Sequence, residues 1–190
     1  MKRIAMVALT TAALLGLAGA PTGDALAQRR IQLAFNAEPA NARYTQQHVI
    51  DVGDVPGHQL RIFEVRHTYP NDPLVINGLK IVESWTRGVS DYTNNNGPAV
   101  VYHVYVAENG DKFFTRSSLV AHKAGAGLSS ITVGRITGGT GKFATMQGEV
   151  RTLVTSDQAA GINEGFTTIE YVLNPETDAK ASRAPAAGQR

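Results

Sequence analysis

The sequence predicts an all-β fold, an eight-stranded antiparallel up-and-down barrel. Runs of alternating apolar and polar residues recur between about residues 45 and 174, and Gly, Asn, Asp and Pro separate them. No window of helical length keeps a 3.6-residue period. Adjacent antiparallel strands in one small domain remove their exposed edges by closing on themselves, which favours a barrel. A β-sandwich is the alternative that the pattern leaves open.

Eight segments have the strand pattern, and each ends where turn residues begin. The clearest pair flanks Asn109-Gly110, because Asn-Gly adopts the positive φ angles of a tight antiparallel turn. Longer loops are expected at 67–77 and 93–98, where a barrel mouth would lie. In chain order the predicted strands are 47–51, 59–68, 79–90, 99–107, 112–120, 130–137, 148–155 and 165–173.

The N-terminus predicts a cleavable signal peptide over residues 1–27. Lys2 and Arg3 precede an apolar run at 4–17 that is too short to span a bilayer, and Ala25-Leu26-Ala27 has the small-x-small pattern of a cleavage site. We therefore expect a periplasmic or secreted protein without a stable membrane anchor.

The rest of the chain divides into one domain and two tails. Residues 28–44 lack a sustained period and are predicted to be an N-terminal extension, 45–174 to be the barrel, and 175–190 to be a disordered tail of Ala, Pro, Gly and charged residues.

Composition excludes several classes of function. Cleavage of the signal peptide would remove Lys2, Arg3 and Asp24, which changes 18 basic and 16 acidic residues to 16 and 15. A net charge this close to zero argues against nucleic-acid binding. The absence of cysteine excludes disulfides and thiolate chemistry. The five histidines form no closely spaced ligand pair, so neither a metal site nor a cofactor is predicted.

A glycine motif links the chain to a known group of barrels. Residues 136–143 read Ile-Thr-Gly-Gly-Thr-Gly-Lys-Phe, and Gly148-Glu149-Val150 follows. This motif resembles one that allene oxide cyclases and dirigent proteins share, and the similarity extends loosely over 58–173. The resemblance implies an eight-stranded barrel with a ligand cavity, often trimeric. The glycines themselves are interpreted as a sharp bend between strands, with Phe143 closing the barrel end.

The resemblance also implies a catalytic residue. Arg61-Ile62-Phe63-Glu64-Val65 is similar to the first acidic strand of these families, where the glutamate acts in the pocket. A carboxylate in an apolar lumen would have a raised pKa, which suits Glu64 to acid–base catalysis. The chain departs from the cyclase pattern at Arg66 and Val133, which argues against allene oxide cyclisation. An ion pair between Glu64 and Arg66 is the structural alternative.

Strand alternation does not decide which residues face the lumen. Leu60, Ile62, Glu64 and Arg66 form one face of the second predicted strand, while Arg61, Phe63, Val65 and His67 form the other. We hypothesise a charged, aromatic cavity for a polar-headed apolar ligand. Its predicted ligand-binding residues are Arg66, Glu83, Arg87, His103, Tyr105, Arg116 and Arg135.

Two functions therefore remain open from the sequence. In the first, the barrel binds a small, partly apolar molecule and steers its cyclisation or isomerisation without a cofactor, with Glu64 as acid, base or charge stabiliser. In the second, the chain is a non-catalytic envelope carrier or a structural barrel protein. A homo-oligomer, a trimer by resemblance, is expected in either case.

Overall fold

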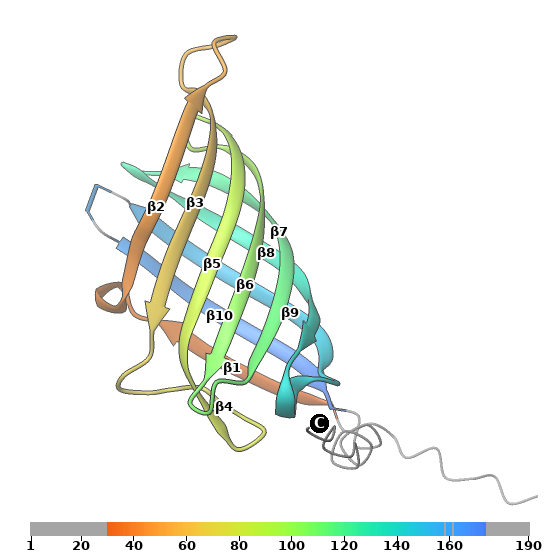
Figure 1. The fold of residues 1–190 in the computed structure, drawn as a ribbon. Helices are drawn as coiled ribbons and strands as arrows, with labels where there is room; N and C mark the ends of the chain where they lie inside the picture. The colour runs from red at the N-terminus through yellow and green to blue at the C-terminus, as the bar shows by residue number, and fades with distance from the viewer. Residues whose placement is uncertain (1–29, 158, 161, 174–190) are drawn as a thin grey trace, which may run out of the picture.

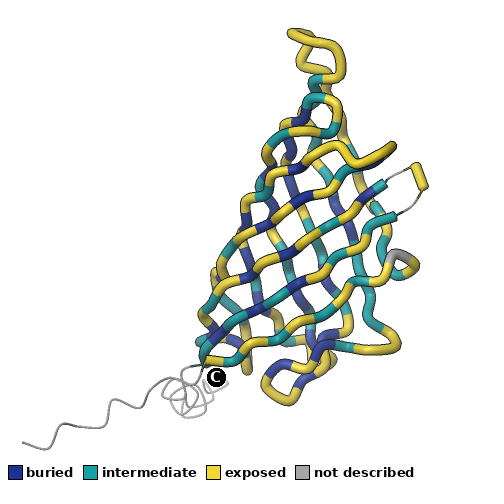
Figure 2. Tube along the Cα trace, turned by 180° about the vertical axis from the view of Figure 1, so that it is seen from behind, coloured by how far each residue is buried: buried dark blue, intermediate teal, exposed yellow. Residues whose placement is uncertain are grey.

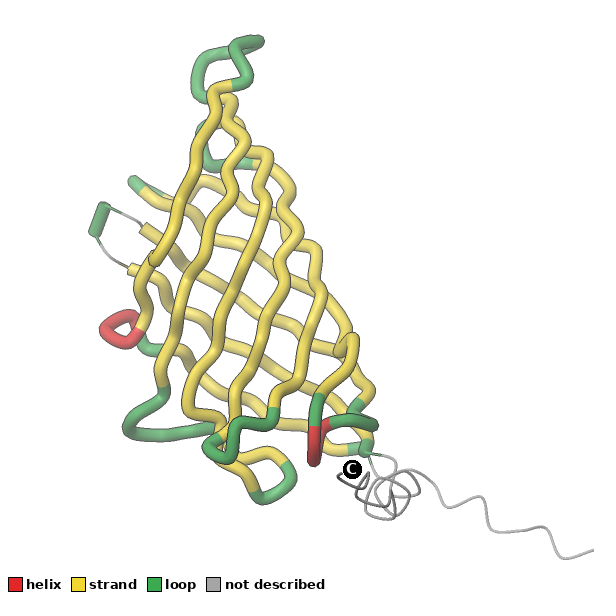
Figure 3. Tube along the Cα trace, in the orientation of Figure 1, coloured by secondary structure: helices red, strands yellow, loops and turns green. Residues whose placement is uncertain are grey.

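Nearly all described residues of the chain belong to antiparallel strands (Figure 1, Figure 3). The computed structural model describes residues 30–157, 159–160 and 162–173. The predicted signal peptide and C-terminal tail lie outside these residues. In the described part of the chain, no helix has the length and apolar character needed to cross a membrane.

All eight predicted segments are strands, with ends that differ by a few residues. Two further strands, β1 and β4, were not predicted. The 3-10 turns are η1 (Pro39–Asn41) and η2 (Gly141–Phe143). The strands are β1 (Ile31–Ala37), β2 (Ala42–Asp51), β3 (His58–Thr68), β4 (Val75–Ile76), β5 (Leu79–Thr93), β6 (Gly97–Ala107), β7 (Lys112–Ala124), β8 (Gly127–Gly139), β9 (Gln147–Asp157) and β10 (Ile162–Val172).

The hydrogen-bonded ladder is open, which corrects the predicted closed barrel of eight strands. The sheet has ten strands in the order β1-β10-β9-β8-β7-β6-β5-β3-β2, with β4 paired to β5. From β5 to β10 each strand pairs with its chain neighbours in the up-and-down manner expected. Within the described residues, no ladder joins the edge strands β1 and β2, so backbone hydrogen bonds do not close the sheet.

The predicted N-terminal extension contains part of the sheet. Residues 28–44 were expected to lack regular structure, yet β1 pairs with β10 from Ile31 opposite Tyr171 to Ala37 opposite Gly165. Strand β2 begins at Ala42 and pairs with β3. A bulge at Thr45 interrupts this edge strand, which hinders pairing with another chain.

The sheet rolls so that two walls face each other. Strands β2, β3, β5, β6 and β7 form one wall, and β8, β9, β10 and β1 cross behind it at a steep angle (Figure 1). Buried and exposed residues alternate along the strands (Figure 2), as expected for a sheet with one enclosed and one solvent-facing side.

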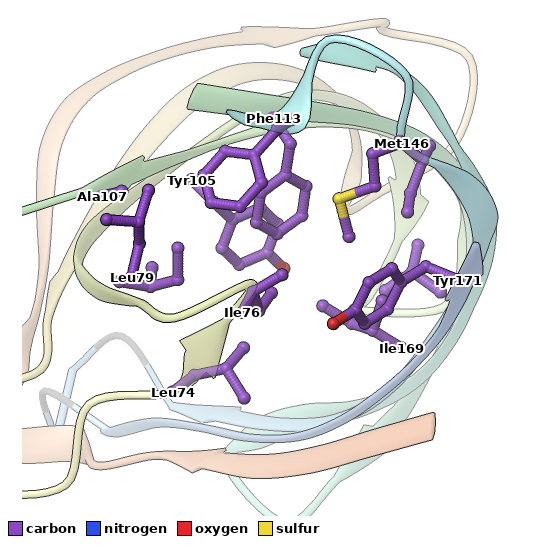
Figure 4. Packing of buried hydrophobic residues seen from close by; sticks show 13 residues of the cluster. Leu74, Ile76, Leu79, Tyr105, Ala107, Phe113, Met146, Ile169 and Tyr171 are labelled. Carbon is purple, nitrogen blue, oxygen red and sulfur yellow. The ribbon is translucent and has the colours of Figure 1, made fainter. Parts of the chain in front are cut away.

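One end of the roll is filled by apolar side chains. Phe113, Phe143, Ile76, Ile81 and Ile169 are completely buried there, with Leu74, Met146 and Tyr171 beside them (Figure 4). Phe143 comes from η2 and Ile76 from β4, so two short connecting elements contribute to this plug beside the long strands. Phe143, predicted to close a barrel end, is completely buried in this apolar cluster.

The glycine motif shapes the connection that carries Phe143. Gly141 has φ +50°, a left-handed conformation that glycine adopts without strain. A Cβ atom on Gly139 would lie 2.4 Å from the backbone oxygen of Phe143. Gly139 is therefore needed because the backbone at Phe143 approaches it too closely for a Cβ atom. Gly141 is needed because the turn requires a positive φ.

Candidate functional site

The roll encloses a cavity of about 110 Å³ beyond the apolar plug. Every strand except β4 contributes to its lining. One water needs about 10–15 Å³ of such space, so the cavity holds several waters or one small organic molecule.

Hydroxyl groups dominate the buried wall of the cavity. Thr152 and Thr167 share a hydrogen bond of 3.0 Å, whereas the Ser90 hydroxyl has no hydrogen-bond partner within the described residues. A buried hydroxyl without a partner is costly, so Ser90 offers a ligand or a water a hydrogen bond. The buried serines and threonines of the lining are Ser84, Ser90, Ser130, Thr132, Thr152, Ser156 and Thr167.

Two histidines face the cavity from β3 and β6. Burial lowers the pKa of His67 to about 4, and burial together with the nearby His67 lowers the pKa of His103 to about 4. Both imidazoles are therefore neutral near pH 7, and each has one nitrogen that accepts a hydrogen bond. His103 Nδ1 lies 3.1 Å from the Thr115 hydroxyl, which fixes its ring.

Aromatic rings join the cavity to the apolar plug. Tyr105 stacks between His103 and Phe113, with ring centroids 5.9 Å and 4.4 Å away. Tyr69 shares a hydrogen bond of 2.7 Å with Ser84, and burial raises its pKa to about 12. The aromatic lining therefore offers apolar contact surface, and the Tyr69 hydroxyl stays protonated near pH 7.

Of the eight predicted site residues, only His103 and Tyr105 line the cavity. Arg61, Phe63, Val65 and His67 form the inner face of β3, so Glu64 points to the outer face. The expected placement of Glu64 in the lumen is therefore wrong, and the same alternation places Arg66 on the outside.

Glu64 belongs to an ion-pair network on the outer face of β3 and β5. Arg87 Nε donates to Glu64 Oε2 at 2.6 Å, and the Thr45 hydroxyl at the bulge donates to Oε1 at 2.5 Å. The Thr45 hydrogen bond, followed by Arg87, holds the pKa of Glu64 below its usual value. The raised pKa predicted for an apolar lumen is thus wrong, and the partner of Glu64 is Arg87 instead of Arg66.

The remaining predicted residues also lie outside the cavity. Arg66 pairs with Glu83, and the Arg66 and Arg87 guanidiniums each lie 5.1 Å from the centre of the Trp85 ring. Arg116 and Arg135 lie opposite each other on β7 and β8, and both are exposed. Arg116 contacts the Tyr102 ring.

The sequence hypothesis missed the residues that give the cavity its character. Arg61 and His67 belong to the alternative face of β3, and the serines and threonines of β5, β8 and β9 were not predicted to bind a ligand. A signal did exist: Ser130 and Thr132 are two residues apart and Thr152 and Ser156 are four residues apart, and both even spacings place the residues on one strand face. In the described part of the chain, no three His, Asp or Glu side chains gather as a metal site.

The fold and cavity define an all-β protein with a polar interior, and comparisons with known proteins add a likeness in structure. No protein-family profile and no curated protein matches the chain. A pterocarpan synthase dirigent protein is similar in structure, with a TM-score of 0.47, 11% identity, and coverage of 77% of this chain and 90% of that chain. Pyocyanin demethylase is similar with a TM-score of 0.40, 18% identity, and coverage of 74% and 100%.

Proposed function

We propose that the protein binds a small, partly apolar molecule inside the rolled sheet. The observation that carries this proposal is the cavity itself, which nine strands line and where the buried Ser90 hydroxyl has no hydrogen-bond partner among the described residues. A structural protein would gain stability from a filled interior, because unfilled space forfeits packing contacts. A hydroxyl-lined volume that the side chains do not fill therefore favours a ligand.

The same cavity favours binding over catalysis. An imidazole with a pKa of about 4 is a weak base near pH 7, whereas an efficient general base has a pKa near the working pH. Glu64, the predicted catalytic residue, is ion-paired on the outer face. We therefore propose a carrier or sequestering role, with His67 and His103 as hydrogen-bond acceptors for the ligand.

Two neighbouring residues on opposite faces of β8 provide a test. Thr132 is 3% exposed and faces the cavity, while Val133 is 51% exposed and faces outward. Thr132→Phe fills the cavity, and Val133→Phe adds bulk outside. We expect native mass spectrometry of the purified chain to show a bound small molecule that Thr132→Phe removes and Val133→Phe retains. A wild-type chain free of any ligand, both as purified and after incubation with cell extract, would contradict the proposal.

We also propose that copies of the chain associate through an outer apolar row on β7–β10. Its four residues lie opposite one another in register and are 46–58% exposed. Arg151, two residues before Leu153 on β9, lies next to this row and pairs with Glu149 at 4.0 Å, so the surface carries both charges and can complement itself. Light scattering is expected to give the mass of an oligomer. The row consists of Val120, Ile131, Leu153 and Phe166.

Export is the remaining part of the proposal. The basic start, short apolar run and Ala25-Leu26-Ala27 support cleavage before Gln28. N-terminal sequencing of the protein from the periplasm or medium is expected to begin at Gln28. If all of the protein still began at Met1, the proposed cleavage and export would be contradicted.

A further inference from the structure

One imidazole connects two elements at the open end of the roll. His58 begins β3, and its ring lies between Asp54 of the β2–β3 turn and Asp91 of β5. Nδ1 lies 2.6 Å from Asp54 Oδ1, and Nε2 lies 2.7 Å from Asp91 Oδ1. Each ring nitrogen therefore faces a carboxylate oxygen at hydrogen-bond distance. We call these three residues the His58 cluster.

The two distances define the protonation state of the ring. A neutral imidazole has one N–H donor, and its second nitrogen presents a lone pair that a carboxylate oxygen repels. Only the imidazolium donates to both aspartates. Accordingly, the hydrogen bonds to Asp91 and Asp54 raise the pKa of His58, and the hydrogen bond from His58 lowers the pKa of Asp54.

The other charged groups of this end face away from the ring. Asp51 of β2 accepts from the Gln59 amide at 2.9 Å, on the inner face of β3. Arg61 and Lys123 line a hollow of about 370 Å³ on that same inner side. The β5–β6 turn contributes three asparagines, which carry no charge. Among the described residues, the two aspartates of the His58 cluster therefore set the charge that the ring experiences.

The His58 cluster holds the β2–β3 turn beside the neighbouring turn. The β2–β3 turn projects beyond the rest of the sheet, and its residues are exposed (Figure 1). A backbone hydrogen bond of 3.0 Å from Asn94 N to Gly57 O also joins it to the β5–β6 turn. Gly57 and Asn94 both line the hollow, which shares Ser90 and Tyr92 with the cavity. The position of this turn therefore shapes the solvent side of the cavity.

We propose that the His58 cluster is a pH-sensitive connection: its proton fixes the β2–β3 turn to β5, and loss of that proton releases the turn from the edge of the hollow. Deprotonation leaves one N–H for two carboxylates, so one of the two contacts is lost. Because the folded pKa of His58 is raised above its ordinary value of 6.5, the connection is complete below that value and is lost as pH rises through the folded pKa. The connection needs no ligand in the cavity, so it extends beyond the proposed function.

Amide hydrogen exchange of the purified chain tests this connection. After correction for the intrinsic pH dependence of exchange, peptides covering 52–58 are expected to exchange at least about threefold faster above the titration of His58 than below it. Asp91→Asn is expected to give the fast exchange at every pH, because it removes the carboxylate on β5. The matched control Asp72→Asn, at an exposed position on another loop, is expected to behave as the wild type. Exchange in 52–58 that follows the intrinsic pH dependence alone would overturn the inference.

NMR titration of the His58 ring provides a second measurement. The ring is expected to titrate at a higher pH in the wild type than in Asp91→Asn, and equal titration in the two chains would also overturn the inference. His58→Gln is expected to remove the pH dependence of exchange in 52–58.

The cavity variant separates this inference from the proposed function. Thr132→Phe, which fills the cavity, is expected to keep the pH dependence of exchange in 52–58. If that dependence disappears in Thr132→Phe, the turn responds to occupation of the cavity and the inference fails. If native mass spectrometry finds no bound molecule while the pH dependence is present, the proposed function fails and this inference stands.

Discussion

The interior of the roll has two regions, and they are built from different side chains. At the plugged end Phe113, Phe143 and Ile76 are completely buried, and aromatic rings contact each other directly. At the open end Ser130, Thr132 and Thr152 are nearly as buried, yet they surround unfilled space. Side chains that are equally buried therefore contribute differently in the two regions. In the plug they contact one another and stabilise the fold by packing, whereas around the cavity they border space that side chains do not fill and make fewer packing contacts.

The largest expected effect tests the plug. Phe113→Ala removes a ring that stacks on Tyr105 and meets Phe143 edge to face, so the free energy of unfolding should fall by about 3–5 kcal/mol. Urea denaturation measures the loss. Phe114→Ala, at the next residue on the other face of β7, should lower the free energy of unfolding clearly less.

The cavity wall should respond differently. Thr132→Val should change the free energy of unfolding by no more than about 1 kcal/mol. A loss as large as that of Phe113→Ala would show that the plug and the cavity wall contribute alike to stability.

The expected effect of intermediate size is a fall in the free energy of unfolding at acidic pH. The pKa of His67 and of His103 is about 4 in the folded chain and near 6.5 in the unfolded chain. The unfolded state thus binds more protons between pH 4 and 6.5, and the free energy of unfolding falls as pH drops through this window. Each histidine contributes up to about 1.4 kcal/mol per pH unit. Denaturation at several pH values should show this slope, with His103→Gln reducing it and the exposed His122→Gln leaving it intact.

The smallest effect is expected outside both regions. Glu64→Gln removes an ion pair whose Arg87 partner is half exposed, so unfolding should become easier by less than about 1 kcal/mol. Since the folded pKa of Glu64 is lowered, its contribution is present above its unfolded pKa and disappears as pH falls through the folded value. Cavity binding should be unchanged in calorimetry. Loss of binding in a folded Glu64→Gln chain would restore a functional role for this carboxylate.

The strands themselves were predictable because turn residues bound each of them. Strand β1 was missed although Ile31, Leu33 and Phe35 alternate with polar or small residues. The seven-residue pattern is short, and the η1 turn that follows it hides the period over a longer window. Strand β4 has two residues and forms only through its pairing with β5, a tertiary contact that local sequence does not report.

The candidate site was harder to predict because the usual polarity is reversed around the cavity. The outer face carries Ile62, Val89 and Ile131, each more than half exposed, while serine and threonine line the inside. Alternation shows which residues share a face of a strand. Here, however, the more hydrophobic face is the outer one, so hydrophobicity predicts the wrong face as the interior. The choice depends on how the whole sheet rolls, and that is why Glu64 was misplaced and His67 overlooked.

The pairing of β1 with β10 makes the order of assembly differ from the order of synthesis. Arg30 and Glu170, 140 positions apart, form an ion pair at 2.6 Å beside this ladder. Strands β5 to β10 each find a partner in the strand just made, at a small loop-closure cost. Strand β1 can pair only after β10 has been synthesised, so the wall behind the cavity forms only when the chain is nearly complete.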